Sequence, residues 1–384
     1  MEKRLIKQFV AVMTGSSFVG LVTKLFLFGA ILGILYFSAK GFNTGFKITD
    51  KPAAKIPPPI PKVSIDSIFI KQNDLSKLDQ SKIITLIATG DVIPARGANW
   101  PATKSGDFTI NWQKTADFLK KADLTLIDLE APLIKGCPLM TQGFTFCGDA
   151  RHIQGILFAG VDSVSLANNH IGNFRGEGIS ETENLLEANQ IGWSGFSHLD
   201  THEVKGIKFG FLAFNGVGAS FDRAGMAAQI TENKKKVEVL VVSAHWGMEY
   251  ELLPKPSPGV APDDPKEIAH LIIDSGADLV IGNHPHTVQG VELYKNKFIS
   301  YAHGNFIFDQ TWSEETKEGV VGEYTFYISE PEGQALEANL VNVKYYPTKF
   351  DTSYQPRFLS EKDGQHILDR MLQSTQLIAS SSNN

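Results

Sequence analysis

Metal-binding side chains recur in this sequence directly after short apolar stretches. The clearest example is the segment of residues 278–286, which ends in Gly-Asn-His-Pro-His, so that His284 and His286 form an H-x-H pair. Two imidazoles at this spacing can converge on one metal ion. His245 likewise follows the largely apolar residues 237–243, with only Ala244 between them. A histidine there is also compatible with a buried core residue, so His245 is a candidate ligand only together with the pair.

Three earlier apolar stretches end in oxygen-bearing side chains. Residues 83–89 lead into Gly90 and Asp91, residues 124–128 lead to Glu130, and residues 163–166 lead to Asn169 and His170. Each group alone is a weak signal, because Asp and Asn are common in turns. Their repetition indicates a site, since carboxylate, amide and imidazole groups together form a mixed ligand set that suits Zn, Mn or Fe.

The elements that would position these residues follow a strand–helix rhythm. Apolar, β-branched stretches predict strands over residues 83–89, 124–128, 163–166, 207–214, 237–243, 278–281 and 298–302. Amphipathic stretches predict helices over 112–122, 178–189 and 265–275, and a late helix over 367–377 follows two more strands, 322–329 and 338–346. This alternation indicates an α/β fold with a largely parallel sheet, whose sites lie beyond the carboxyl ends of the strands.

The order of these motifs resembles one family. The relevant segments are Gly90-Asp91 with Arg96, Leu129-Glu130-Ala131-Pro132, Asn168-Asn169-His170, His245-Trp246-Gly247, the stretch from Gly276 to His286, and Gly304-Asn305-Phe306 with Asp309. Over about residues 83–309 they look like the CapA branch, involved in poly-γ-glutamate capsule synthesis, of the calcineurin-like metallophosphoesterase superfamily. The resemblance implies an α/β/β/α sandwich.

The resemblance also implies a division of roles. Its metal ligands would be Asp91, Glu130, Asn169, His245, His284 and His286, holding one or two divalent ions, Mn, Fe or Zn. Glu130 would bridge two ions, with Asp91 and His286 on one and Asn169, His245 and His284 on the other. His170 would be the general acid, and Arg96 would steady developing charge on a phosphoryl group, with Arg175 a weaker candidate.

Several positions depart from the wider pattern. Ile93 stands where the wider superfamily has a histidine, and Glu130 where it has an aspartate; both changes are typical of the CapA branch. Asn283 and His303 differ from the branch itself. The departures reduce the donor strength at one of the two metal positions.

The amino terminus predicts a membrane anchor. Residues 17–39 are apolar apart from Lys24 and a few small polar side chains, which is long enough to cross a bilayer if Lys24 snorkels. We therefore expect a cytoplasmic segment over residues 1–16, a single span over 17–39 and an extracytoplasmic remainder at the cell membrane. The alternative is a signal peptide cleaved after Gly41.

The rest of the chain divides into three parts. Residues 40–82 are expected to form a linker, because five prolines within residues 51–62 favour an extended spacer. Residues 83–350 would form the CapA-like domain, and residues 351–384 a C-terminal helix followed by a disordered tail over residues 380–384. Cys137 and Cys147 flank a short loop and are expected to form a disulfide if the domain is exported, the alternative being two unlinked thiols.

Two functions follow as hypotheses. The first is a membrane-anchored protein of capsule or poly-γ-glutamate synthesis with a metal-dependent phosphoesterase-type site. The alternative is a non-catalytic partner that binds or helps to export an anionic polymer. Expected partners are the membrane, an anionic polymer or phosphoester substrate, and membrane-bound capsule synthesis proteins. The net charge of −6 argues against a nucleic-acid binder, which needs a basic surface.

Overall fold

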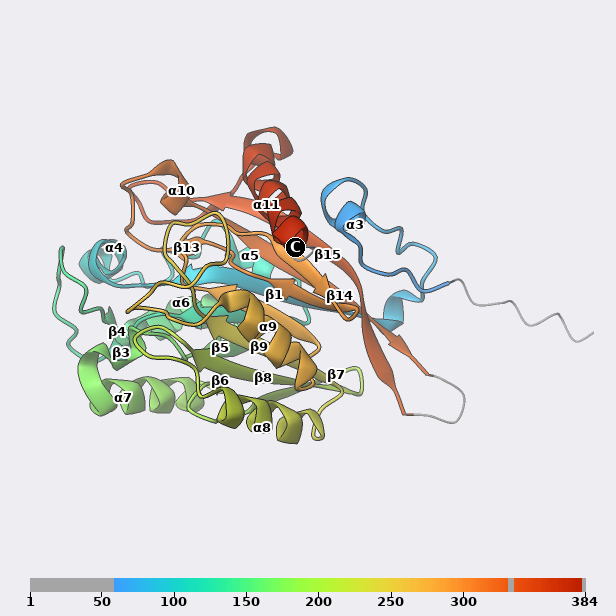
Figure 1. Ribbon diagram of the computed structural model, residues 1–384. Coiled ribbons are helices and arrows are strands. Elements are labelled where there is room, and N and C mark those ends of the chain that lie inside the picture. The colour runs from blue at the N-terminus through green and yellow to red at the C-terminus, as the bar shows by residue number, and fades with distance from the viewer. Residues whose placement is uncertain (1–58, 331–334, 382–384) are drawn as a thin grey trace, which may run out of the picture. The chain divides into compact units, whose positions relative to one another are not determined.

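Two mixed β-sheets packed face to face form the centre of the structure, a computed structural model that describes residues 59–330 and 335–381 (Figure 1). These residues belong to one unit, Pro58–Asn384. The predicted anchor over residues 17–39 and residues 40–58 of the predicted linker lie outside the described residues. Within residues 59–330 and 335–381, no helix is both long and apolar enough to span a membrane.

The first sheet has eight strands in the order β16-β15-β14-β1-β2-β5-β6, with β13 also paired to β1. Its parallel part contains β1 (Ile83–Val92), β2 (Leu124–Leu129), β5 (Ser163–Ser165), β6 (Gly192–Ser194) and β13 (Asn305–Ile307). Its antiparallel part contains β14 (Glu318–Ser329), β15 (Glu337–Lys349) and β16 (Arg357–Phe358).

The second sheet has six strands in the order β11-β12-β10-β9-β8-β7. Its four central strands are parallel: β8 (Ile207–Asn215), β9 (Val239–His245), β10 (Leu279–Asn283) and β12 (Lys297–Ser300). The edge strands β7 (Asp200–Val204) and β11 (Val291–Tyr294) are antiparallel to their neighbours. A separate pair is formed by β3 (Leu133–Ile134) and β4 (Gly148–Asp149).

Side chains alternate between the space inside the sandwich and its outer layers. Leu86 of β1 and Leu126 of β2 pack with Val241 of β9 in the core between the sheets. Ile87 and Ile127, one residue further along each strand, instead pack in the outer core of the first sheet. This is the period of two that a strand imposes on its side chains. The arrangement is the predicted α/β/β/α sandwich.

Helices cover both outer faces. α6 (Ile153–Ala159) and α7 (Arg175–Ala188) pack on the first sheet, and α8 (Arg223–Lys234) and α9 (Pro265–Asp274) on the second. The remaining helices are α3 (Ile65–Phe69), α4 (Arg96–Ser105), α5 (Ala116–Leu119), α10 (Glu314–Lys317) and α11 (Glu361–Ser381), with 3-10 turns η1 (Gln80–Lys82), η2 (Ala150–His152) and η3 (Ile171–Phe174). The helix predicted over residues 112–122 is wrong in extent, because only α5 is helical there.

Both ends of the described chain pack on the sandwich. Helix α3 begins with a capping box at Ser64 and buries Ile68 in the core between the sheets, and Asn73 donates to the Val341 carbonyl of β15. The folded unit thus includes residues before 83. At the other end, α11 buries Ile367 between the sheets and is longer than predicted. Its last residues, 380 and 381, were expected in a disordered tail; residues 382–384 lie outside the described range.

Candidate metal centre

The candidate site lies between the two sheets at the carboxyl ends of their parallel strands. On β2, Leu124 and Leu126 face the inner core, so the same alternation directs Asp128 and Glu130 inward. On β9, Val239 and Val241 face the core, so His245 also points inward. The first sheet therefore contributes carboxylates and the second contributes imidazoles.

Carboxylates and imidazoles meet across this boundary. Asp91 Oδ2 lies 3.1 Å from His286 Nδ1, and Asp128 Oδ2 lies 3.3 Å from His245 Nδ1. Glu130 Oε1 lies 3.4 Å from His245 Nε2. All five side chains are at most 3% exposed. Within the first sheet, the parallel pairing of β1 with β2 sets Asp91 opposite Asp128.

Burial and mutual attraction shift the pKa values of these groups. Burial opposes charge on all of them, but the neighbouring Glu130 carboxylate raises the pKa of His245 to about 10 and that of His286 to about 9. Burial likewise opposes ionisation of Glu130, yet His245 and His286 hold its pKa well below the usual range. Burial raises the pKa of Asp91 to about 6. The cluster is thus a set of ion pairs in the absence of a metal.

Several buried polar atoms of the cluster have no hydrogen-bond partner among the described residues. They are both carboxylate oxygens of Glu130, both carboxylate oxygens of Asp128, both ring nitrogens of His284, Nδ1 of His245 and Oδ1 of Asn283. Glu130 Oε1, Asp128 Oδ2 and His245 Nδ1 still have the ion-pair contacts given above, whereas the other atoms have neither kind of partner among the described residues. A buried polar atom without a partner is costly, by about 1–3 kcal/mol each. Burial and the nearby imidazoles hold the pKa of His284 well below its usual value, so this ring is neutral and able to ligate. A divalent cation would satisfy these atoms, and the donor set fits it.

The ligand atoms fall into two groups. Glu130, His284 and His286 form one, and Asp91, Asp128, Glu130 and His245 form the other, each with its ligand atoms within 4.8 Å of one another. Glu130 is common to both, as the predicted bridging role requires. The other assignments differ from the predicted division, because His284 groups with His286, and Asp91 groups with His245.

Asn169 and His170 lie at the rim of the cluster. Asn169 Oδ1 accepts a hydrogen bond from His245 Nε2 at 2.8 Å. His170 Nδ1 donates to Asn173 Oδ1 at 3.0 Å, which leaves Nε2 facing Glu130 Oε1 at 3.9 Å. Burial lowers the pKa of His170. The ring is half-buried, so it is accessible to a molecule bound at the cluster.

Arg96 is held beside the site and not among the ligands. Its guanidinium forms an ion pair with Asp309 and donates to the Gly143 carbonyl at 2.8 Å. It also lies 4.6 Å from the ring centre of Phe146, whose ring centre is 4.1 Å from that of His170. Arg96 therefore supports the loop that carries Phe146. Arg175, the weaker candidate, is exposed at the start of α7.

The disulfide predicted between Cys137 and Cys147 is confirmed, and it closes this same loop. Asn173 Oδ1 accepts from the Phe146 amide at 2.6 Å as well as from His170. The loop and the histidine thus share one hydrogen-bond acceptor. The loop is part of the wall around the candidate general acid.

The backbone of the H-x-H motif is strained. His284 has φ +95° and His286 has φ +57°, in a region that side chains other than glycine rarely adopt. Such strain persists where surrounding structure enforces it and is frequent at functional sites.

Nearby, Gly90 approaches Gly304 so closely that a Cβ on Gly90 would lie 1.9 Å from the Gly304 carbonyl oxygen. This contact brings β13 against the end of β1.

Sequence reasoning missed two residues of the site. Asp128 was not predicted, although its spacing of two from Glu130 on a strand places both on one face. Asn305 accepts from His286 Nδ1 at 2.9 Å and pairs with Asp91 in the register of β1 and β13. It orients the ring so that Nε2 can face a metal. His303, noted as a departure, binds the Thr89 carbonyl and Tyr324 in the core behind the site.

The part of the chain that contains the candidate metal centre resembles known proteins. A family model described as "Bacterial capsule synthesis protein PGA_cap" matches residues 85–310, which include all the predicted site residues. Capsule biosynthesis protein CapA of Bacillus anthracis is 23% identical over 273 residues, covering 64% of this chain and 64% of that protein. PGA biosynthesis protein CapA of Bacillus subtilis (strain 168) is 30% identical over 179 residues, covering 41% and 45%. The chain thus spans less than two thirds of either relative.

Among solved structures, a putative 5′-nucleotidase from Staphylococcus aureus in complex with alpha-ketoglutarate matches with 14% identity and a TM-score of 0.41. The match covers 75% of this chain and 58% of that one. The family model alone covers more than half of the present chain. The chain belongs to the bacterial capsule synthesis (CapA) family.

Proposed function

We propose that this chain is a membrane-anchored CapA-family protein of capsule or poly-γ-glutamate synthesis, with a metal-dependent phosphoesterase-type site. One observation carries the site: Asp128, Glu130 and His284 are buried between the sheets with ligand atoms that no described residue satisfies by a hydrogen bond. Groups kept at such a cost are explained by a bound cation. The family membership and the names of the relatives support the role in capsule synthesis.

The ligands in this proposal are the two groups that share Glu130. Asp91, Asp128 and His245 would complete one metal position, and His284 and His286 the other. A divalent ion held there supplies Lewis-acid chemistry toward a phosphoryl oxygen. Asn305 fixes the His286 ring through Nδ1.

His170 would act as the general acid. Asn173 Oδ1 accepts a hydrogen bond from Nδ1, so the proton that the cationic ring can transfer is the one on Nε2, which faces the cluster. A pKa lowered by burial makes that proton easier to give to a leaving oxygen. Phe146 packs on the ring and limits its rotation.

The test combines metal analysis with a panel of phosphoesters on the purified protein. We expect one or two divalent ions per chain, with turnover that falls by about 10²–10⁴-fold in His170→Asn while the metal content is unchanged. The matched control is His198→Asn, which changes an exposed histidine that contacts the Trp193 carbonyl and ring and is not part of the cluster. Full turnover in metal-loaded His170→Asn would contradict the assignment.

We also propose the anchor over residues 17–39, with the folded unit extracytoplasmic. The apolar length of this segment and the disulfide support it, since disulfides persist outside the reducing cytoplasm. Cell fractionation combined with protease accessibility of intact protoplasts tests it. We expect the folded unit to be recovered in the membrane fraction and to be cleaved by protease added outside the protoplasts. A protected, soluble product would contradict it.

The second candidate is a non-catalytic partner that binds an anionic polymer. A matching Mycobacterium tuberculosis protein is described as a probable polyglutamine synthesis accessory protein, which favours a supporting role. The absence of a histidine at Ile93 points the same way. Metal-loaded protein that binds polyglutamate but turns over no phosphoester in the panel would favour this function over the enzyme.

A further inference from the structure

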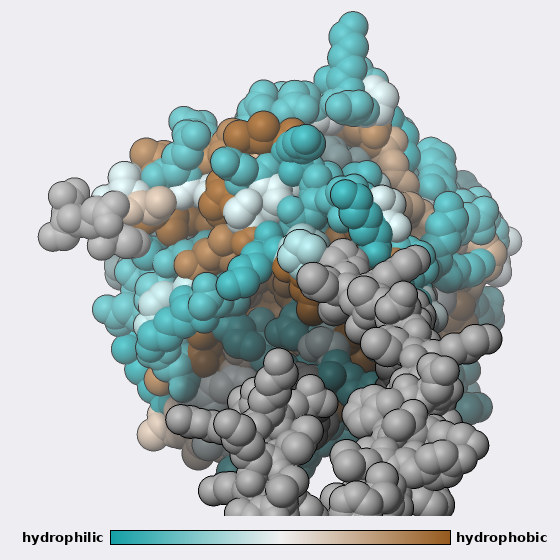
Figure 2. All heavy atoms as spheres, turned by 90° about the vertical axis from the view of Figure 1, so that its right-hand side faces the viewer, coloured by the Kyte–Doolittle hydropathy of each residue, from teal (hydrophilic) through white to brown (hydrophobic). Residues whose placement is uncertain are grey.

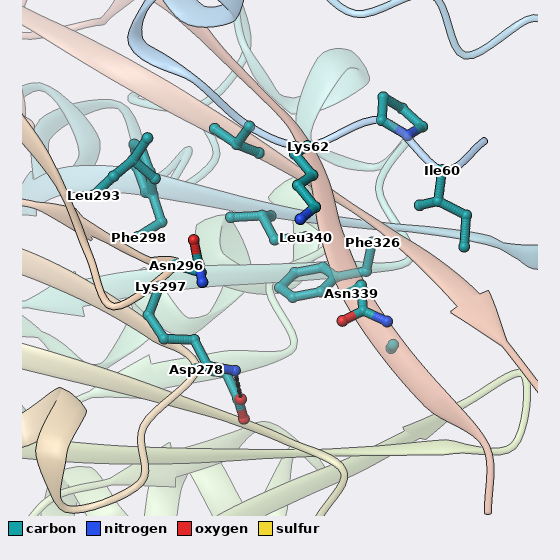
Figure 3. Close-up of a pocket in the computed structure, with 13 residues that line it drawn as sticks. Ile60, Lys62, Asp278, Leu293, Asn296, Lys297, Phe298, Phe326, Asn339 and Leu340 are labelled. Atoms are coloured by element: carbon teal, nitrogen blue, oxygen red, sulfur yellow. Dashed lines mark hydrogen bonds and ion pairs between the residues drawn. The ribbon is translucent and has the colours of Figure 1, made fainter. Parts of the chain in front are cut away.

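Groups that touch a substrate at the metal centre must lie at the carboxyl ends of the parallel strands. The hollow in Figure 3 lies at the other end, because Asp278 and Lys297, which form an ion pair in its lining, are at the amino ends of β10 and β12. Figure 2 views this end of the molecule, where hydrophobic and hydrophilic residues are mixed on the surface. A strand such as β10, with five residues, spans about 16 Å, so residues of this hollow do not reach the metal centre.

At the metal centre itself, no lysine or arginine of the described residues pairs with a carboxylate of the cluster. The three carboxylates form ion pairs with histidines only. Arg96, which was predicted to steady charge on a phosphoryl group, is instead paired with Asp309. In phosphoryl transfer, the three equatorial oxygens of the phosphoryl group carry the charge of the transition state. A donor other than arginine is therefore needed for these oxygens.

Tyr250 lies at the rim of the cluster beside His286. The centres of their rings are 6.2 Å apart, and the Tyr250 amide donates to the Pro285 carbonyl, within the H-x-H motif, at 2.8 Å. Tyr250 has φ +61°, in the left-handed region that a tyrosine rarely adopts. Its side chain is 45% exposed. The residue is thus held in a strained conformation against the motif and is still accessible to a ligand.

A chain of hydrogen bonds orients the Tyr250 hydroxyl relative to His286. His286 Nδ1 donates to Asn305 Oδ1, and Asn305 Nδ2 donates to Gln310 Oε1 at 3.2 Å. Gln310 Nε2 then donates to the Tyr250 oxygen at 3.2 Å. Asn305 and Gln310 are both buried. Because the Tyr250 oxygen accepts this bond, its own proton is directed to a different acceptor.

The Tyr250 hydroxyl keeps this proton at neutral pH. A phenol has a pKa of about 10 in water. Burial raises the pKa of Tyr250, and the carboxylates of Glu249 and Glu130 add to the rise. Glu130 is the ligand common to both metal groups, so its effect on the phenol also shows that the hydroxyl is near the cluster. The hydroxyl is therefore a neutral hydrogen-bond donor beside the metal centre.

We propose that Tyr250 donates a hydrogen bond to a non-bridging phosphoryl oxygen of the substrate, the role that had been predicted for Arg96. This inference rests on the proposed function. The phenol keeps its proton throughout and stabilises charge on the oxygen as that charge develops. His170, on the part of the rim beside Phe146, protonates the leaving oxygen, so the two residues have separate tasks. Gln310 is a positioning residue that acts through Tyr250.

The test is Tyr250→Phe, which removes the hydroxyl and leaves the ring. In metal-loaded protein, kcat should fall about 10–100-fold, the range for one hydrogen bond to a charged oxygen. KM and metal content should be unchanged. Binding measured by calorimetry gives a readout that does not depend on turnover. Vanadate, whose five-coordinate form resembles the transition state, should bind about tenfold more weakly, whereas orthophosphate should lose less than about threefold.

Two control variants accompany it. Tyr327→Phe removes a hydroxyl from β14 where this strand pairs with Ile83 at the start of β1, and should change neither affinity. Glu249→Gln removes the neighbouring carboxylate but keeps the phenol, and should not weaken vanadate binding. Unchanged vanadate affinity in Tyr250→Phe, or equal losses for vanadate and orthophosphate, would overturn this inference and leave the proposed function intact. Metal-loaded wild-type protein that neither binds vanadate nor turns over a phosphoester would overturn both.

Discussion

Breaking the disulfide between Cys137 and Cys147 should destabilise the domain by a calculable amount. The bond joins residues 10 apart in sequence. In the chain-entropy model, a loop of this size removes about 9 cal/mol/K from the unfolded chain, which is about 2.7 kcal/mol at 25 °C. Unfolding of roughly 330 residues has an entropy of about 0.7 kcal/mol/K, so the melting temperature should fall by about 4 °C.

The assay is calorimetry of three samples: the oxidised protein, the protein with a phosphine reductant, and the double variant Cys137→Ser/Cys147→Ser. The reduced protein and the variant should agree, because both lack the same constraint. A local effect should accompany the global one, since Phe146 in this loop stacks on His170 and shares Asn173 with it. Phosphoester turnover should therefore fall while metal content stays constant. A melting temperature within about 1 °C of the oxidised protein would refute the reasoning.

Four further outcomes are expected. Glu130→Gln removes the ligand common to both metal groups and should lower metal affinity more than about 100-fold. It also leaves the buried imidazoliums of His245 and His286 with one carboxylate fewer, Asp128 and Asp91 remaining, which should cost the metal-free protein about 3 kcal/mol in urea unfolding. Asp128→Asn should weaken metal binding by about 10–100-fold in equilibrium dialysis, whereas His170→Asn should not. The pKa values of His245 and His286 are raised to about 10 and 9, so metal binding at pH 7 should release about two protons. Calorimetry in buffers of different ionisation enthalpy measures this release. For the same reason, the affinity for the metal should rise from pH 7 to pH 9. Burial opposes the charged form of His202, but the Asp200 carboxylate at 2.9 Å favours it more strongly, so the pKa of His202 is raised. The stability that this ion pair contributes should therefore be present below pH 6.5 and be lost as the pH rises through the folded-state pKa. His202→Gln should accordingly lower the free energy of unfolding more at pH 6 than at pH 9.

The strands of the fold could be predicted because their apolar runs are buried on both faces. Such runs leave a continuous hydrophobic signal in the sequence. The helix expected over residues 112–122 failed for a tertiary reason. Trp112 is buried against Phe306, and Gly155 of α6 lies so close that a Cβ there would be 2.6 Å from the Trp112 ring. Packing fixed this segment in turns, although its pattern of apolar residues suits a helix.

Site residues could be predicted where a polar side chain follows an apolar stretch in the sequence. They could not be predicted where their role depends on which strands pair in the sheet. His284 and His286 were found because an H-x-H after an apolar run is unusual. Asp128 was overlooked because it lies inside such a run, where it reads as part of the strand. Its role depends on Asp91, which faces it only through the parallel pairing of β1 and β2. That pairing joins residues far apart in the chain and leaves no local signal.

The division of ligands between the sheets couples the site to the packing of the sandwich. Asp91, Asp128 and Glu130 belong to the first sheet and its strand ends, and His245 and His284 to the second. Neither sheet alone provides both the carboxylates and the imidazoles, so the cluster exists only when the inner faces of the two sheets are packed together. Any cation bound there favours the packed state by mass action, in proportion to the logarithm of its concentration over its dissociation constant. The hydrophobic core and the metal ligands lie on the same strand faces, and each therefore stabilises the geometry that the other requires.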